Sequence, residues 1–462
     1  MVVIKSEQQY QQFLSDIALQ KVFVDYVIAD PDKHPKYQGN PVSSAPYTRV
    51  IAIFIKNIDS NVTYCINIWH QDVHNFELNH LNVIPDIVKV TKNVFVTDKK
   101  RFMHIFGHQE VDDIILYKFQ EGLIEHDTED FTTKYHDFVK TKQYNQHKLN
   151  NIVPLAKHLE AFEDKFDYYK NDMLNFITSD AYRQMNTVIA ETLCDIEANG
   201  MKVNLEEYNK HFSDKPIELD MVYTEYNLYT STGRPSNHFG GINYAALKKD
   251  DGSRRSFVSR FGNDGMLITM DYSAYHPRII ANLVKYPIGM GVNIYEYLGK
   301  QFFNTDTIDV ELLKKAKQLT FLNLYGGVKD EYLHIPYFQK VNEYVKHRWE
   351  FFNENGYVET PIFKRRITKN HIIDANPNKL FNYILQSSEI EFGMPLIKRI
   401  NEYLKTKQSR VVLYVYDSIL VDAYSGDGVE MLKTVRDILV NEQFPVKCYA
   451  GRTYHNMAII DL

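Results

Sequence analysis

The stretch GMLITMDYSAYHPR, residues 265–278, places an aspartate at the end of a short apolar run. The apolar run predicts a buried strand that ends at Asp271. A carboxylate in this place is costly to remove from water unless it is paired or binds a metal ion. The simpler interpretation of a single strand end is that the aspartate only begins a turn.

A second aspartate lies in RVVLYVYDSILVDA, residues 410–423, which predicts two strands joined by a tight turn at Tyr416-Asp417-Ser418. If the fold brings Asp271 and Asp417 together, they could hold two Mg²⁺ ions. That arrangement is used for in-line phosphoryl transfer, because the two cations neutralise the attacking and leaving oxygens.

Between the two aspartates, the segment KKAKQLTFLNLYGG, residues 314–327, predicts a helix. Lys317, Phe321 and Tyr325 are spaced i, i+4 and i+8 and therefore share one helix face, and Lys314 lies one turn before Lys317. A lysine beside an aromatic ring suits a triphosphate and a stacked base. The alternative is an amphipathic helix whose aromatic stripe is core, with the lysines at its edge.

Composition narrows the class of protein. The 462 residues predict two or three domains, and 44% hydrophobic with 24% charged residues is typical of a globular chain. Three cysteines without a CxxC pair exclude a disulfide scaffold and favour a reducing compartment. No apolar run approaches the roughly 20 residues that span a bilayer, so we expect a soluble, cytoplasmic protein without a membrane partner. The net charge of −6 requires local basic patches for any nucleic-acid contact.

Five short segments follow one another along the chain, and their order as well as their residues is informative: STGRPSN (231–237), DYSAYHPR (271–278), the helix at 314–327, NYILQ (382–386) and VYDSILVD (415–422). Together they make residues 185–462 resemble the family A DNA polymerases, the group of bacterial DNA polymerase I and many phage replicases. The resemblance implies an α/β fold, in which an exonuclease-like (RNase H-like) domain over 1–180 precedes a right-hand polymerase over 181–462. The palm would comprise about 185–285 and 370–462, and the fingers about 285–370.

The resemblance also implies roles for single residues. The metal ligands would be Asp271, Asp417 and the backbone carbonyl of Tyr272, holding two Mg²⁺ ions, with Mn²⁺ as a possible substitute. The incoming dNTP would contact Tyr272, His276, Lys314, Lys317, Phe321 and Tyr325, and the primer-template DNA would contact Arg234, Arg278, Asn382 and Gln386. The reaction would be attack of a primer 3′-hydroxyl on the α-phosphate with release of pyrophosphate.

The chain departs from the family pattern at several points. His276 stands where the family has a glutamate beneath the sugar, and we expect discrimination against ribonucleotides to survive. The family's last motif reads His-Asp-Glu, and Ser418 stands in place of its glutamate. Leu313 stands in place of the arginine that usually begins the fingers helix, and Lys314 could supply that arginine's phosphate contact. Only residues 205–230 occupy the place of the thumb, which predicts low processivity unless a partner protein or a dimer contact replaces it.

The N-terminal region resembles the family's 3′–5′ proofreading domain by position, and four residues fit its pattern: Asp25, Asp98, Tyr168 and Asp172. Its first motif should read Asp-x-Glu, but position 27 is valine. Because a missing metal ligand usually damages such a site, the sequence favours a structural, inactive exonuclease-like domain over active proofreading.

Three functions remain open on the sequence. A DNA-templated DNA polymerase, of a type expected in phage genome replication in the host cytoplasm, explains the most residues. A 3′–5′ exonuclease would leave Asp271 and Asp417 unexplained. A catalytically weak polymerase relative that binds DNA as a replication accessory would have no chemical reason to keep Asp271, Asp417, Lys317 and Tyr325.

Overall fold

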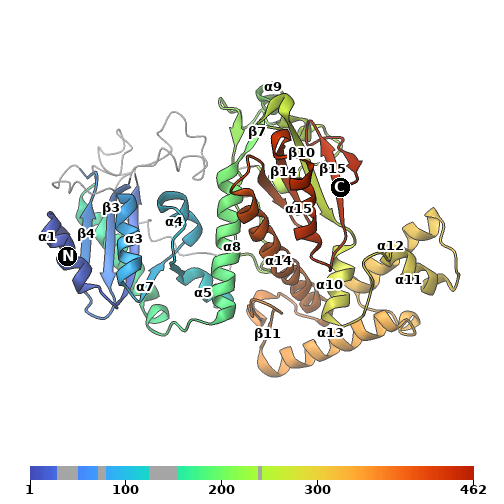
Figure 1. The fold of residues 1–462 in the computed structure, drawn as a ribbon. Coiled ribbons are helices and arrows are strands. Elements are labelled where there is room, and N and C mark those ends of the chain that lie inside the picture. Colours follow the sequence, from blue (N-terminus) through green and yellow to red (C-terminus); the bar gives the residue numbers. More distant parts are fainter. Residues whose placement is uncertain (29–49, 71–79, 124–152, 238–241) are drawn as a thin grey trace. The chain divides into compact units, whose positions relative to one another are not determined.

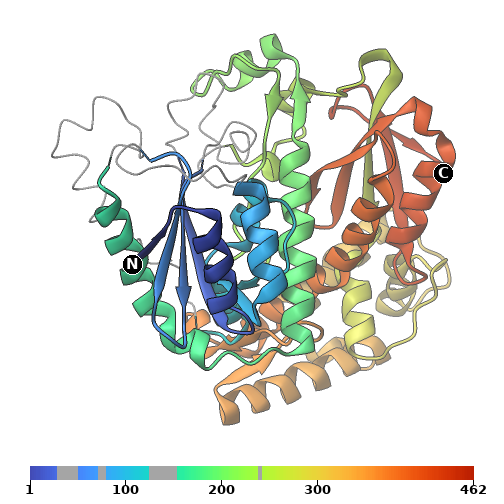
Figure 2. The same cartoon turned by 60° about the vertical axis from the view of Figure 1, so that its left-hand side comes forward.

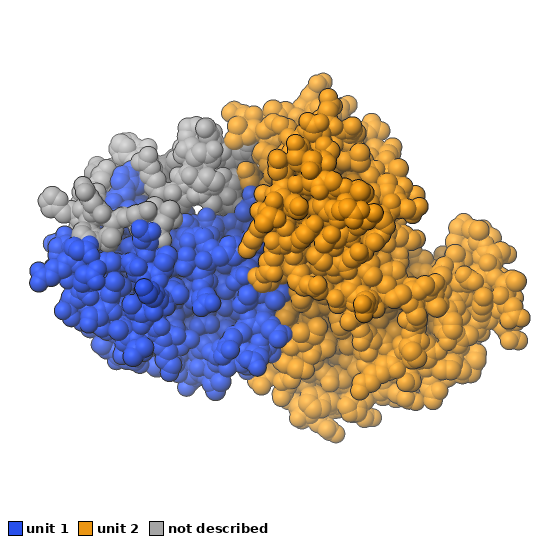
Figure 3. All heavy atoms as spheres, viewed as in Figure 1, with its two compact units in different colours: residues 1–198 blue, residues 199–462 orange. Residues whose placement is uncertain are grey.

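The computed structural model describes residues 1–28, 50–70, 80–123, 153–237 and 242–462 (Figure 1). Its backbone contacts divide the chain into two compact units, residues 1–198 and 199–462, which are coloured separately in Figure 3. The predicted boundary at residue 180 falls at the start of helix α8 (Asp180–Asn199), which runs up to this division. None of the helices in the described parts of the chain is long and apolar enough to cross a membrane.

The first unit is built on one mixed sheet with the strand order β1-β4-β3-β2-β5-β6. The central strands pair antiparallel, whereas β1 with β4, β2 with β5 and β5 with β6 are parallel. The strands are β1 (Val2–Ile4), β2 (Lys21–Ile28), β3 (Val50–Asn57), β4 (Thr63–Asn67), β5 (Asn93–Val96) and β6 (Asp112–Asp113). Every residue of β3 is buried, which indicates that both faces of the sheet are covered.

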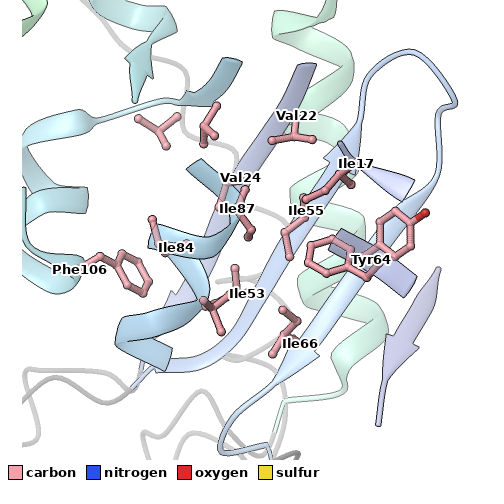
Figure 4. Packing of buried hydrophobic residues seen from close by; sticks show 14 of the residues in the cluster. Ile17, Val22, Val24, Ile53, Ile55, Tyr64, Ile66, Ile84, Ile87 and Phe106 are labelled. Atoms are coloured by element: carbon pink, nitrogen blue, oxygen red, sulfur yellow. The ribbon is translucent and has the colours of Figure 1, made fainter. Parts of the chain in front are cut away.

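Alternation along β2 and β3 explains this burial, because successive side chains of a strand point to opposite faces. Helices α1 and α3 lie against one face of the sheet (Figure 2), and their residues join Val22, Val24, Ile53 and Ile55 in one core cluster (Figure 4). On the other face the Phe54 ring stacks on Phe162 of α7, with 5.3 Å between ring centroids. The helices of this unit are α1 (Glu7–Asp16), α3 (His80–Val90), α4 (Lys99–Phe106), α5 (Ile114–Gln120), α7 (Leu155–Leu174) and α8.

The second unit is centred on an antiparallel sheet with the order β13-β14-β10-β15-β16. Strand β10 (Gly265–Tyr272) ends as predicted beside Asp271, and β13 (Arg410–Val415) and β14 (Ser418–Tyr424) form the predicted hairpin. Its two-residue turn holds Tyr416 at a φ of +55°, a left-handed conformation that non-glycine residues seldom adopt. The sheet is completed by β15 (Val446–Gly451) and β16 (Ala458–Ile460).

Helices and two small sheets complete the second unit. Helix α12 begins after its cap Asp309 and ends at Gly326, where Gly327 takes a φ of +95° and leaves no room for a side chain beside Asn378. The other helices are α9 (Leu205–His211), α10 (Tyr275–Leu283), α11 (Ile294–Phe303), α12 (Val310–Gly326), α13 (Pro336–Asn355), α14 (Pro377–Leu404) and α15 (Val429–Val440). The small sheets comprise β7 (Met201–Val203), β8 (Met221–Val222) and β9 (Phe257–Val258), and β11 (Tyr357–Glu359) with β12 (Arg366–Thr368).

The segment at 205–230, where the sequence predicts a minimal thumb, is described throughout. It holds the seven-residue helix α9 and the two-residue strand β8, and no longer element. No long helix therefore lies in this described segment.

Candidate active site

Sheet pairing brings the two predicted aspartates to one place. Asp271 is the residue of β10 that lies opposite Ser418 of β14, so Asp417 is its neighbour in the adjoining hairpin turn. The backbone N–H of Tyr272 donates to the carbonyl of Asp417 at 3.0 Å, which fixes the strand end against the turn. Both aspartates line one cavity of about 720 Å³ in the second unit.

The electrostatics of the pair favour a bound cation. Burial, and next the charge of Asp417, raise the pKa of Asp271 to about 6, although Lys249, Lys447 and Lys317 act in the opposite direction. Burial, followed by the charge of Glu389, also raises the pKa of Asp417. Two carboxylates that are each costly to ionise in the protein alone gain stability from a divalent cation between them.

The donor set fits a hard cation that shares its shell with a substrate. No cluster of three or more His, Cys, Asp or Glu side chains able to hold a metal occurs in the described residues. Two carboxylates and a backbone carbonyl leave several positions for water and phosphate oxygens, as Mg²⁺ prefers in sites that bind nucleotides. Asp271, Asp417 and Tyr272 would therefore hold such an ion jointly with a triphosphate.

Helix α12 presents most of its predicted face to the same cavity, although Tyr325 is not among the lining residues. Lys314, Lys317 and Phe321 are among the lining residues. Tyr325, one turn beyond, stacks on Phe321 with 5.7 Å between ring centroids and 13° between the planes. The Lys317 ammonium lies 5.7 Å from the centroid of the Tyr295 ring, on the neighbouring α11. The helix thus offers positive charge at one end of its exposed face and stacked rings at the other.

His276 lies in the first turn of α10 and connects this helix face to a residue that the sequence did not single out. Its Nδ1 hydrogen-bonds the Tyr325 hydroxyl, and its Nε2 lies 3.0 Å from a carboxylate oxygen of Glu389 on α14. The side chain of Glu389 is completely buried and lines the cavity. The sequence contained a signal for this residue. Glu389 and Glu391 lie two residues apart in SEIEFGM, residues 388–394, and on a helix this spacing points them in nearly opposite directions, so they cannot share one exposed face.

Arg234 of the STGRPSN segment reaches the cavity from a loop. One guanidinium nitrogen lies 3.3 Å from a carboxylate oxygen of Glu389. The guanidinium also stacks on the Tyr416 ring, 3.6 Å from its centroid. Arg234 therefore contacts the residue directly before Asp417 as well as the carboxylate beside His276.

Of the remaining predicted DNA-contacting residues, Arg278 lines the cavity and Asn382 and Gln386 do not. Arg278 lines it, but its guanidinium donates to the carbonyls of Gly289 and Val292, at 3.3 and 2.6 Å, and so holds that loop. Asn382 donates to the backbone carbonyl of Tyr325 at 3.4 Å. Gln386, one turn further on α14, is half-buried and is not among the residues that line the cavity.

Comparison with known proteins shows which sequences this chain resembles. No protein-family model matches the chain. DNA polymerase I of Caldicellulosiruptor bescii is 27% identical over a match that covers 42% of this chain and 26% of that protein. DNA polymerase I of Deinococcus radiodurans is 22% identical, covering 46% of this chain and 25% of the relative. The chain is thus similar in sequence to bacterial DNA polymerase I over somewhat less than half of its length.

The fold agrees with this relationship. The solved POL domain of Pol1 from M. smegmatis, in complex with DNA primer-template and dNTP, matches with a TM-score of 0.70 and 15% identity. The match covers 98% of this chain and 99% of that one, so the two chains share the same mixed α/β fold over nearly their whole length. The present chain spans about a quarter of the length of the curated relatives that it matches.

The four predicted exonuclease residues of the first unit contact lysine side chains or a helix N-terminus. Asp25 on β2 forms an ion pair with Lys165 at 2.5 Å, and Asp172 on α7 pairs with Lys118 at 3.0 Å. Asp98 caps α4 by accepting from the Arg101 backbone N–H. Tyr168 is half exposed, with the Lys118 ammonium 5.3 Å from its ring centroid. Lysines thus neutralise two of the carboxylates that a nuclease would need for metal ions.

Proposed function

We propose that the chain is a DNA-templated DNA polymerase that adds dNTPs to a primer 3′-hydroxyl. The observation that carries this proposal is the convergence of Asp271, Asp417 and the basic, aromatic face of α12 on one cavity. The sequence similarity to DNA polymerase I supports it. A role in phage genome replication belongs to the same proposal.

In the reaction, the primer oxygen forms a bond to the α-phosphorus of the dNTP while the bond to the β-phosphate oxygen breaks and pyrophosphate leaves. Two Mg²⁺ ions held by Asp271, Asp417 and the Tyr272 carbonyl would activate the hydroxyl and offset the phosphate charge. Mn²⁺ could take their place. Lys314 and Lys317 would bind the triphosphate as point charges, which orients it for in-line attack.

The aromatic end of the α12 face would receive the sugar and base. Phe321 would border the sugar, and Tyr325 would close over the nascent base pair. His276, hydrogen-bonded to Tyr325, would lie beneath the sugar and would oppose a 2′-hydroxyl. Arg234, Arg278, Asn382 and Gln386 would contact the primer-template duplex, in the case of Arg278 through the loop that it holds.

The first unit would be an exonuclease-like domain without proofreading activity. Asp25 and Asp172 are each neutralised by a lysine ammonium, and Val27 takes the place of a metal-binding glutamate. A cationic side chain competes with a divalent ion for the same oxygens. With residues 205–230 too short for a thumb, we further propose low processivity, which a partner protein or a dimer contact could raise.

The proposal is tested by primer extension with purified wild-type protein, Mg²⁺ and four dNTPs, beside Asp417→Asn. A matched control is Asp437→Asn on the exposed surface of α15. Extension by the wild type and the control, but not by Asp417→Asn, supports the polymerase. Primer binding without extension by any protein would favour the accessory function, and primer shortening would favour the exonuclease.

A further inference from the structure

Glu389 is a buried carboxylate between two parts of the candidate site, and none of the predicted roles uses it. It lies in the middle of α14, where the Tyr275 hydroxyl donates to its backbone carbonyl at 3.0 Å. Its two carboxylate oxygens have different partners: one faces His276 at 3.0 Å and the other faces Arg234 at 3.3 Å. Burying a carboxylate so completely requires such partners, which indicates that this position is specified by its contacts.

The hydrogen-bonding capacity of each group determines which atom donates at each contact between Glu389, His276 and Tyr325. An ionised carboxylate only accepts hydrogen bonds, so the proton on this side of the imidazole must sit on Nε2 of His276. In the neutral imidazole, Nδ1 is then the acceptor, and the Tyr325 hydroxyl donates to it. Glu389 therefore selects the tautomer of His276, and that tautomer orients the Tyr325 hydroxyl.

The orientation of Tyr325 matters because its ring stacks on Phe321, and Phe321 lines the cavity next to Lys317. A Tyr325 side chain that is held by stacking on Phe321 and by a hydrogen bond from its hydroxyl to His276 has little freedom to move. We propose that Glu389 is a positioning residue for sugar selection: acting through His276, it holds Tyr325 so that the nucleotide site has no room for a 2′-hydroxyl. This inference rests on the polymerase function proposed above.

The two-sided contact makes Glu389→Gln a sharp test. A glutamine side chain is uncharged and offers one acceptor oxygen and one donor NH₂, so it cannot present an acceptor oxygen to both His276 and the Arg234 guanidinium. If the NH₂ faces His276, it selects the opposite tautomer, and Nδ1 then donates to Tyr325. If the NH₂ faces Arg234, two donors oppose each other. Either way the shape of residue 389 is kept, while the arrangement that presents an acceptor oxygen to both His276 and Arg234 is lost.

The same helix supplies a matched control. Glu391, two residues further, is also buried, but it accepts from the backbone N–H of Ile362 at 2.6 Å and does not line the cavity. Glu391→Gln makes the same chemical change at a similar depth. Its effect reports what the loss of a buried carboxylate from α14 does in general.

The experiment compares single-nucleotide incorporation of a dNTP and the matching rNTP opposite one template base. For Glu389→Gln we expect the ratio of kcat/KM for dNTP over rNTP to fall at least tenfold, or about 1.4 kcal/mol. Glu391→Gln should keep the ratio within about threefold of the wild type. An active wild type whose ratio is unchanged by Glu389→Gln would overturn the inference alone, whereas an inactive wild type would overturn the proposed function.

A double-mutant cycle separates positioning from a general structural effect, and its His276→Gln variant alone serves if Glu389→Gln is unstable. His276→Gln breaks the same chain from its middle, so it should lower the ratio by a similar factor. Because Glu389 acts through His276, the double variant should discriminate no worse than His276→Gln. Losses that multiply in the double variant would contradict the proposed chain of contacts.

Discussion

Replacing Asp271 by asparagine should stabilise the metal-free protein. Burial and the nearby Asp417 raise the pKa of Asp271 from 3.8 to about 6, so the ionised form is less favourable in the folded protein than in the unfolded chain. A shift of this size corresponds to about 3 kcal/mol at most. Because the carboxyl is only half-buried, solvent screening reduces the expected gain to about 1–2 kcal/mol. Asparagine keeps the size of the side chain and removes this cost.

The sign follows from proton binding. Between pH 3.8 and about 6 the folded protein binds more protons at Asp271 than the unfolded chain does, so wild-type stability falls as pH rises through this window. The advantage of Asp271→Asn is therefore complete above about pH 6 and vanishes below about pH 4.

The assay is thermal unfolding in EDTA at pH 7.5 and pH 4, with Asp437→Asn as the exposed control. A gain of 1 kcal/mol raises the Tm by about 2–4 °C in a unit of this size. Added Mg²⁺ should raise the Tm of the wild type and not that of Asp271→Asn, because a ligand stabilises only the state that binds it. A lower Tm for Asp271→Asn in EDTA at pH 7.5, or a difference that does not change with pH, would refute this reasoning.

Three further outcomes are expected. Lys317→Ala should raise KM for dNTP about tenfold through loss of a phosphate contact, whereas Lys315→Ala on another face of α12 should not. Equal effects of the two substitutions in steady-state kinetics would contradict the assignment of Lys317 as a triphosphate contact. Without dNTPs, the wild type and Asp25→Ala should leave a labelled primer equally intact on a gel, and shortening that Asp25→Ala abolishes would mean active proofreading. Under excess trap DNA the monomer should make short products, increasingly so at higher salt; long products from single binding events would overturn the account of residues 205–230.

The sequence was sufficient for the parts of the site that depend on local spacing. The strand ending at Asp271, the hairpin turn at Asp417 and the shared helix face of Lys317 and Phe321 follow from periods of two and 3.6 residues. Their convergence could be inferred only from the order of motifs, because pairing between β10 and β14 joins residues about 150 positions apart.

Long-range contacts explain what the sequence did not reveal. The partnership of His276 with Glu389 spans 113 residues, and that of Asp25 with Lys165 spans 140. No local pattern indicates which buried face of α14 meets α10, or which lysine of α7 reaches β2. The substitution of His276 for a glutamate could be noticed in the sequence, but the buried carboxylate beside it required the fold.

The measurement that tests the central claim most directly is primer extension by the wild type beside Asp417→Asn, with Mg²⁺, four dNTPs and a labelled primed template. We predict template-dependent extension by the wild type and a loss of about 10²–10³-fold in Asp417→Asn, the scale on which removal of a group that stabilises transition-state charge acts. Equal extension by both proteins, or none by the wild type on a primer that it binds, would contradict the assignment of this cavity as a polymerase active site.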